Sequence, residues 1–96
     1  MDYTVLENKV LDEIEALFKS FKGQFSEKGI SYSIQLKRDK SNNDNYFSEI
    51  EILFNKDGNF IDVIEFFVVR EGKKYIDENN LIKELYLDIE GILSLV

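Results

Sequence analysis

Residues 46–69 read YFSEIEILFNKDGNFIDVIEFFVV and contain the clearest structural signal in the sequence. Two apolar runs flank Asn55-Lys56-Asp57-Gly58, which is typical of a type I turn whose last residue is left-handed and forms a bulge. The stretch is therefore expected to be an antiparallel hairpin. On its first face, the turn geometry pairs Asn55 with Asn59, Phe54 with Phe60, Ile52 with Asp62, Ile50 with Ile64 and Ser48 with Phe66. On its second face, it pairs Leu53 with Ile61, Glu51 with Val63, Glu49 with Glu65 and Phe47 with Phe67.

The two faces of this hairpin differ in composition. The first is mainly apolar and should pack against helices. The second mixes apolar side chains with acids, and Glu49 opposite Glu65 would cause repulsion across the strands. The preceding strand, residues 30–38 (ISYSIQLKR), alternates cleanly, so its second face carries Ser31, Ser33, Gln35 and Lys37. An apolar patch among carboxylates, on a sheet whose next strand is polar on that face, predicts a protein-binding surface.

Helices are predicted before and after the strands. Thr4-Val5-Leu6-Glu7 fits a capping box, in which the Glu7 side chain would reach back to the Thr4 amide. The helical stripe that follows consists of Leu6, Val10, Ile14, Leu17, Phe18, Phe21 and Phe25. Gly29 rather than Gly23 should end this helix, because Phe25 continues the stripe. A turn at Glu71-Gly72 precedes a short strand over 73–76. Asp77 then caps a last helix with the stripe Leu81, Ile82, Leu85, Ile89, Ile92, Leu93 and Val96.

The order of these elements gives the fold class. An N-terminal helix, a three- to four-stranded antiparallel sheet and a C-terminal helix make one α+β domain, αβββ(β)α, over residues 1–96. Both helices are expected on one face of the sheet, because the strand over 30–38 has a polar second face. Two alternatives are open. One helix on each face would make both faces core, or a homodimer would cover the second face or a sheet edge.

Charge limits the range of partners. The chain has 12 basic and 19 acidic residues, which gives a net charge of −7. The segment from Asp44 to Glu65 contains six acidic residues and only one lysine. Such a domain repels phosphate backbones, so direct nucleic-acid binding is disfavoured, while a basic protein would be steered toward it. The sequence has no long apolar run, no secretory signal and no cysteine, so we expect a cytoplasmic protein that does not contact membrane. Its residue usage is typical of an AT-rich bacterial or phage gene.

The sequence lacks the residues that most catalytic mechanisms require. There is no histidine and no cysteine, which removes the common catalytic triads, thiol chemistry and ordinary zinc sites. The loop over 39–45 superficially resembles a calcium loop, but Asp44 and Ile50 stand where that motif needs glycine and glutamate. The acids Glu49, Glu51, Asp62 and Glu65 are interpreted as surface carboxylates. We therefore expect no enzyme, no cofactor and no bound metal.

These observations favour a small intracellular inhibitor that binds another protein. The leading hypothesis is an immunity protein that neutralises a nuclease toxin, because an acidic surface can occupy the basic surface where a nuclease holds nucleic acid. The expected contact residues are Tyr46, Phe47, Glu49, Glu51, Val63, Glu65, Phe67 and Tyr75, with the two phenylalanines as anchors. One alternative is a phage or mobile-element inhibitor that mimics nucleic acid and blocks a defence nuclease. The other is a non-catalytic, homodimeric or regulatory subunit.

Overall fold

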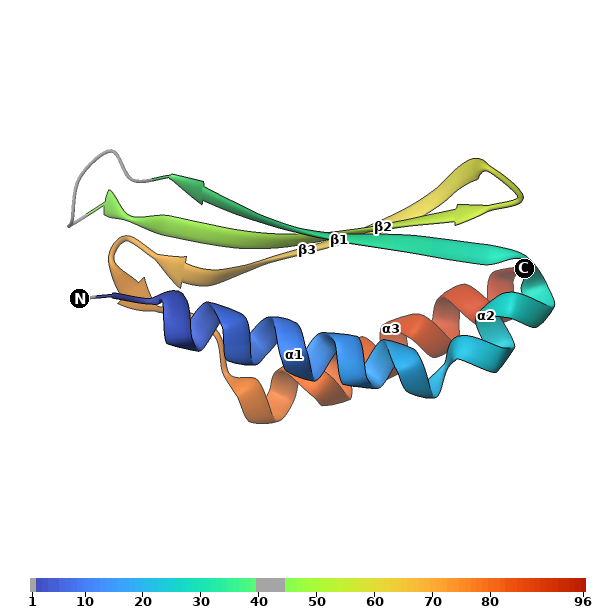
Figure 1. The fold of residues 1–96 in the computed structure, drawn as a ribbon, viewed down its shortest axis with the longest axis horizontal. Coiled ribbons are helices and arrows are strands. Elements are labelled where there is room, and N and C mark those ends of the chain that lie inside the picture. The colour runs from blue at the N-terminus through green and yellow to red at the C-terminus, as the bar shows by residue number, and fades with distance from the viewer. Residues whose placement is uncertain (1, 40–44) are drawn as a thin grey trace.

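The structure is a computed structural model that describes residues 2–39 and 45–96, and three helices lie against one face of a four-stranded sheet (Figure 1). The elements are α1 (Thr4–Ser20), α2 (Lys22–Lys28), β1 (Ile30–Asp39), β2 (Phe47–Lys56), β3 (Asn59–Arg70), β4 (Lys73–Lys74) and α3 (Glu78–Leu95). The strands are antiparallel, in the order β1-β2-β3-β4. The predicted α+β class is confirmed, with its helices on one face, which excludes one helix on each face.

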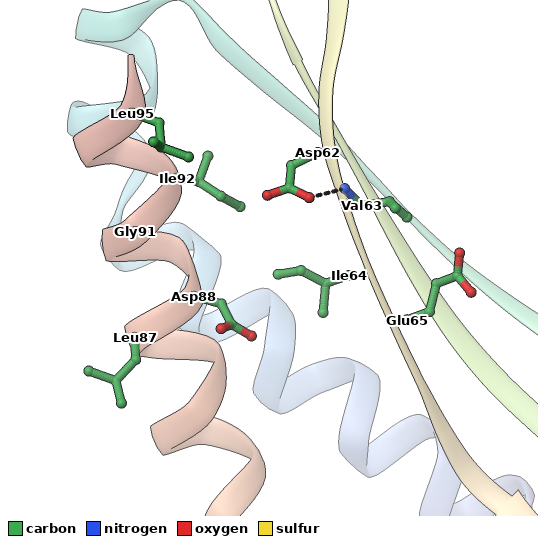
Figure 2. A pocket seen from close by; sticks show the side chains of 9 residues that line it. All are labelled: Asp62, Val63, Ile64, Glu65, Leu87, Asp88, Gly91, Ile92 and Leu95. Atoms are coloured by element: carbon green, nitrogen blue, oxygen red, sulfur yellow. Dashed lines mark hydrogen bonds between the residues drawn. The ribbon is translucent and has the colours of Figure 1, made fainter.

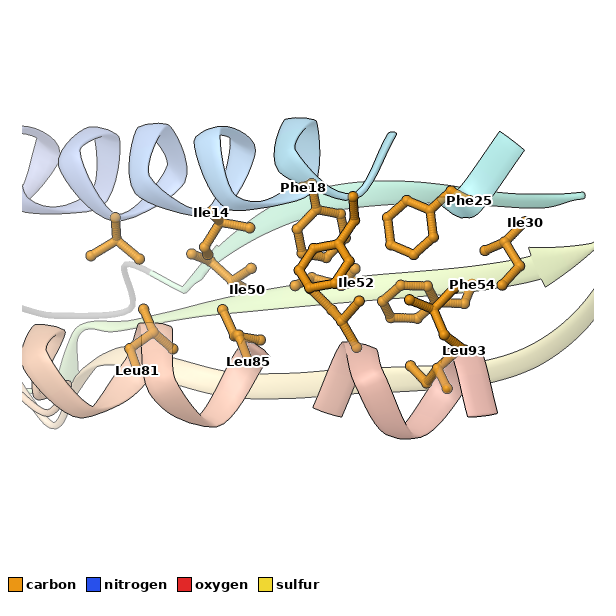
Figure 3. Packing of buried hydrophobic residues seen from close by; sticks show 14 of the residues in the cluster. Ile14, Phe18, Phe25, Ile30, Ile50, Ile52, Phe54, Leu81, Leu85 and Leu93 are labelled. Carbon is orange, nitrogen blue, oxygen red and sulfur yellow. The ribbon is translucent and has the colours of Figure 1, made fainter. Parts of the chain in front are cut away.

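Alternation along β2 places the core on the helix side of the sheet. Ile50, Ile52 and Phe54 have no exposed surface, whereas the residues between them are half-buried. Figure 3 shows these side chains meeting those of α1 and α3, and the Phe18 ring packs 5.8 Å from the Phe54 ring. Each such side chain, fully buried, contributes about 1.5–3 kcal/mol to stability. The hydrophobic effect therefore fixes which sheet face is covered.

The first helix ends earlier than predicted. α1 stops at Ser20, Phe21 leaves helical geometry at φ −100° and ψ 3°, and α2 resumes at Lys22. The Phe21 amide donates to the Phe18 carbonyl at 3.1 Å, which is a tighter turn than an α-helix makes. This change of direction keeps both Phe21 and Phe25 buried. Gly29, the predicted end of the first helix, instead ends α2 in left-handed geometry, with φ +70°.

The predicted capping box is wrong. No side chain caps α1, and the Thr4 amide donates to Asp2 Oδ1 at 2.9 Å. Glu7 is fully buried, and its carboxylate accepts from Arg38 Nε at 2.9 Å and from the Tyr46 hydroxyl at 2.5 Å. A guanidinium and a phenol therefore satisfy this carboxylate in the interior, which offsets the cost of burying a charge.

The hairpin forms as predicted, but its register differs. Asp57 and Gly58 have φ of 50° and 84°, so the turn is a two-residue type I′ turn that pairs Lys56 with Asn59. Ile61 then bulges out of the ladder and lies half-buried against the core, and Phe60 is exposed on the far side. The resulting pairs are Glu49 with Phe67, Glu51 with Glu65, Leu53 with Val63, Ile52 with Ile64 and Ile50 with Phe66. Because this shift is two residues, these side chains keep their predicted faces.

The C-terminal part follows the prediction closely. The Asp77 carboxylate accepts from the Asn79 amide at 3.1 Å and caps α3, whose apolar stripe faces the core. The last strand is shorter than expected, because β4 pairs only with Val69 and Arg70. Among the described residues, most of the outer edge of β3 consequently has no strand beside it.

Candidate protein-binding face

The sheet has one face that no helix of the described part of the chain covers, and we call it the open face (Figure 1). Alternation along the strands places on it Gln35 and Lys37 of β1, Phe47, Glu49, Glu51 and Leu53 of β2, and Val63, Glu65 and Phe67 of β3. Figure 2 shows the division on β3, where Asp62 and Ile64 point toward α3 while Val63 and Glu65 point away from it.

Three carboxylates meet at the centre of the open face. Oxygens of Glu49, Glu51 and Glu65 lie within 4.8 Å of one another. Glu51 and Glu65 are directly opposite across β2 and β3, so like charges face each other in place of the predicted Glu49–Glu65 pair. Such a pair destabilises a sheet by a few tenths to about 1 kcal/mol. A cation from outside would relieve this repulsion.

Lys37 supplies part of that positive charge. Its ammonium lies 2.9 Å from Glu51 Oε2, and about half of the lysine side chain is exposed. The hydrogen bond to Glu51 raises the pKa of Lys37, and the charges of Glu49 and Glu65 raise it further. One lysine faces three carboxylates, so the centre stays net negative and favours a further cation. The sequence placed Lys37 on a polar face, and its pair with Glu51 was not predicted.

The same carboxylates are the described residues that best fit a cation ligand set. Each offers one oxygen, the donor type that Mg²⁺ and Ca²⁺ prefer. Exposed acids gather in this way without a metal as well, and Lys37 already pairs with Glu51. The expectation of no metal stays a prediction. The calcium-loop comparison falls largely on residues 40–44, which lie outside the described residues.

Aromatic side chains occupy the end of the open face next to this acidic centre. The Phe47 and Phe67 rings lie 5.9 Å apart, and the Tyr75 ring meets Phe67 edge-on at 6.0 Å. Arg70 places its guanidinium carbon 5.5 Å from the Phe67 centroid and 5.6 Å from the Tyr75 centroid. Arg70 could not be predicted from the sequence, because a spacing of three along a regular strand places it on the opposite face from Phe67. The register shift opposite Ser48 and Glu49 brings it to the same side. Rings and carboxylates therefore lie side by side on one surface.

Most of the predicted contact residues come together on this surface. The open face contains Phe47, Glu49, Glu51, Val63, Glu65 and Phe67, and Tyr75 lies at its aromatic end. Tyr46 is the exception, because it points to the helix side. Its ring stacks on Tyr3 with centroids 5.4 Å apart, and its hydroxyl binds Glu7. Tyr46 was predicted at the rim, and this placement removes it from the candidate site.

Tyr46 instead belongs to a partly buried polar cluster with the fully buried Glu7 and the more exposed Arg38. Burial raises the pKa of the Tyr46 phenol, and its hydrogen bond to Glu7 raises it further. The hydrogen bond to Glu7 also raises the pKa of Arg38. The cluster joins α1 to the sheet beneath the open face, which makes it a support for the surface and not a part of it.

The comparisons with known proteins identify no relative. No family model matches the sequence, and no curated protein or solved structure matches the chain. Within residues 2–39 and 45–96, no helix combines the length and the apolar character that crossing a bilayer requires.

Proposed function

We propose that this chain is an inhibitor that binds a basic protein through its open face, as an immunity protein neutralising a nuclease toxin in the bacterial cytoplasm. The observation that carries the proposal is the uncovered sheet face, where the Phe47–Phe67 ring pair adjoins three carboxylates held within 4.8 Å. An aromatic anchor beside unbalanced negative charge is the combination that a basic protein surface complements. The chain would act by occupation of that surface, without chemistry of its own.

The aromatic part would provide most of the affinity. An aromatic side chain can bury about 150–250 Å² at low entropy cost, and such residues dominate the energy of protein interfaces. Phe47 and Phe67 are half-buried by their neighbours, so a partner would complete their burial. Their contact with each other fixes both rings before binding, which reduces the conformational entropy lost on association.

The acidic part would provide speed and selectivity. A nuclease holds phosphates with lysine and arginine side chains, and complementary charge raises association rates and discriminates against acidic partners. A lysine or arginine of the partner at Glu49 and Glu65 would relieve the Glu51–Glu65 repulsion at the same time. Binding and the stability of the sheet are thus coupled.

The experiment begins with capture of the partner. The tagged chain is incubated with a lysate of the cells that encode it, as wild type, as Phe47→Ala/Phe67→Ala and as Tyr86→Ala. Tyr86 is 46% exposed on α3 and serves as an aromatic control outside the open face. The captured protein is then purified, and its cleavage of nucleic acid is measured with and without the chain. Circular dichroism checks that each variant is folded.

We expect wild type and Tyr86→Ala to retain one basic nuclease in stoichiometric amount and to inhibit it, and the double variant to do neither. Retention of the partner by the folded double variant would show that the open face is not the binding site. Binding that is lost in salt but insensitive to the double substitution would favour the nucleic-acid mimic. Capture of the chain by itself alone would favour a homodimeric subunit.

A further inference from the structure

The outer edge of β3 is a second candidate binding surface, separate from the open face. β4 pairs only with Val69 and Arg70, so among the described residues no strand lies beside β3 between Asn59 and Val68. An unpaired edge presents a row of backbone donors and acceptors, which another extended chain can use. This edge is separate from the open face, because it lies along the side of the sheet that adjoins α3.

The hydrogen bond of Val63 shows which backbone groups face this edge. Its amide donates to the side chain of its own neighbour, Asp62 Oδ1, at 2.7 Å, and so is directed away from β2. Alternate residues of an antiparallel strand direct their amide and carbonyl groups to the same side. The backbone groups of Glu65 therefore face outward as well. Farther along, the register shift at Val68 turns its carbonyl outward, where it accepts from Tyr75 in the turn to α3.

A groove of about 620 Å³ runs beside this edge, between β3 and α3 (Figure 2). Ile64 and Ile92 line its inner part, and Leu87 and Leu95 stand at the α3 side with 65% and 82% of their surface exposed. Two leucines this exposed on one edge of a helix gain if an apolar group covers them. Gly91 lines the groove on the α3 side, and its lack of a side chain leaves space there.

The charge of the groove selects its occupant. Its nine lining residues include Asp62, Glu65 and Asp88 and no basic residue. A second copy of β3, paired across a two-fold axis, would bring these acids against their own equivalents, which is repulsive. A strand with basic side chains would be attracted instead. Lysine and arginine also carry aliphatic stems that can lie over Ile64 and Leu87 while the charged ends reach Asp62 and Asp88.

We propose that the β3 edge binds an extended segment of a partner protein in which basic and apolar residues alternate. The segment adds a strand to the sheet, with its basic side chains in the groove and its apolar side chains continuing the open face beside Val63. Asp62 releases the Val63 amide when the new strand supplies an acceptor for it. The inference stands on the free edge and the groove, and it would survive if the open face had no partner.

The probe is a synthetic peptide in which lysine alternates with valine, titrated into the full chain and followed by NMR and by amide hydrogen exchange. We expect shifts along β3 and α3 and slower exchange at the Glu65 amide. A peptide with glutamate in place of lysine should not bind. Methylation of the peptide's backbone nitrogens on one edge should abolish binding, and methylation on the other edge should leave it unchanged, because only one edge pairs with β3.

Two glycine substitutions make a matched pair for this test. Gly91→Lys and Gly23→Lys both replace a helical glycine whose added Cβ meets no atom within 4 Å, and both add one positive charge. Only the first places that charge in the groove, so we expect it to weaken peptide binding about tenfold or more while Gly23→Lys has no effect. Equal binding by both variants, binding unaffected by methylation of either edge, or a dimer that forms without peptide and is lost in Gly91→Lys would overturn the proposal.

Discussion

The Glu7 side chain links three parts of the molecule that are far apart in the sequence. It lies in α1, it is fully buried, and it binds Arg38 at the end of β1 and Tyr46 just before β2. A buried carboxylate is stable only while its partners remain, and removal of one side of such a pair leaves an uncompensated charge. The attachment of α1 to the sheet therefore depends on this side chain.

Replacement of Glu7 by glutamine tests this role. Glu7→Gln keeps the shape but removes the charge that Arg38 pairs with, so we expect the free energy of unfolding in urea to fall by about 2 kcal/mol. This is less than for a fully buried pair, because 37% of the Arg38 side chain is exposed. Thr4→Ala is the control for the rejected capping box and should change stability by less than about 0.5 kcal/mol. A larger loss in Thr4→Ala than in Glu7→Gln would contradict this assignment.

The Tyr46 phenol gives a pH-dependent test of the same cluster. Burial and the hydrogen bond to Glu7 raise its pKa, so folding favours the protonated form. Its stabilisation is complete below the unfolded pKa of about 10 and is lost as the pH rises through 10 toward the folded value. We expect the difference in melting temperature between wild type and Tyr46→Phe to be constant from neutral pH to pH 9 and to shrink above pH 10. A difference that stays constant above pH 10 would contradict this role of the Tyr46 phenol.

The sequence is compatible with two roles for Glu7, a helix cap and a core position, and the local spacing favoured the wrong one. Three-residue spacing from Thr4 fits a capping box. The same residue also precedes Val10 by three and Ile14 by seven, which puts it on the core stripe. A charged residue at a core position predicts a buried partner, but that partner lies in β1, and local spacing carries no information about a contact so distant in sequence.

Among the elements, the junction between α2 and β1 is the most constrained. Gly29 ends α2 in left-handed geometry, and its carbonyl accepts from the Asp57 amide at 3.0 Å in the β2–β3 turn. A Cβ on Gly29 would lie 2.4 Å from Asp57 Oδ1. Gly29 therefore lets the start of β1 and the tip of the hairpin approach each other.

Alanine at the two glycines of this region should have opposite effects. Gly29→Ala combines an unfavourable φ of +70° with the contact to Asp57, so we expect a loss of about 1–2 kcal/mol in the free energy of unfolding. Gly23→Ala meets no atom within 4 Å and improves the helix, so we expect a gain of up to about 1 kcal/mol. Chemical denaturation of both variants measures the difference. A stabilised Gly29→Ala would mean that the junction is less tightly packed than described.

For the hairpin, the sequence predicted which face is core but not the register of the two strands. The alternation of Ile50, Ile52 and Phe54 fixed the core face, and any shift by two residues preserves it. Asn-Lys-Asp-Gly is compatible with both the longer turn and the two-residue turn, and only the bulge at Ile61 makes the shorter turn consistent with the core. The correct partner of Glu65, which is Glu51, followed from that bulge and was not visible in the turn sequence.

The Glu51–Glu65 pair predicts a conflict between stability and binding. Glu65→Gln removes like-charge repulsion across the strands, so we expect the free energy of unfolding to rise by a few tenths to about 1 kcal/mol. The same change should weaken binding of a basic partner, chiefly through slower association. Glu27→Gln, an exposed acid on α2, should change neither property. Loss of stability in Glu65→Gln would indicate that Lys37 already balances the three carboxylates.

At the scale of the whole molecule, the helices cover one side of a sheet that carries apolar residues on both. The polar second face of β1 allowed the uncovered side to be predicted, because Ser33, Gln35 and Lys37 need water or polar partners. The identity of a partner could not be predicted, since it depends on a complementary surface that this chain does not encode. Two residues could not be placed from the sequence pattern. Arg70 joins the aromatic end of the open face, whereas Tyr46 lies on the helix side.

Thiol labelling measures directly whether the open face is exposed in the free chain and covered in a complex. The chain has no cysteine, so a single introduced thiol reports one position. Leu53→Cys places it on the open face, and Ser20→Cys places it at the exposed end of α1. The rate of thiol labelling is measured in the free chain and in the complex with the captured partner. We predict that both thiols react quickly in the free chain and that only Leu53→Cys is protected in the complex. Equal labelling of Leu53→Cys in the free and bound chain would show that the partner does not bind the open face.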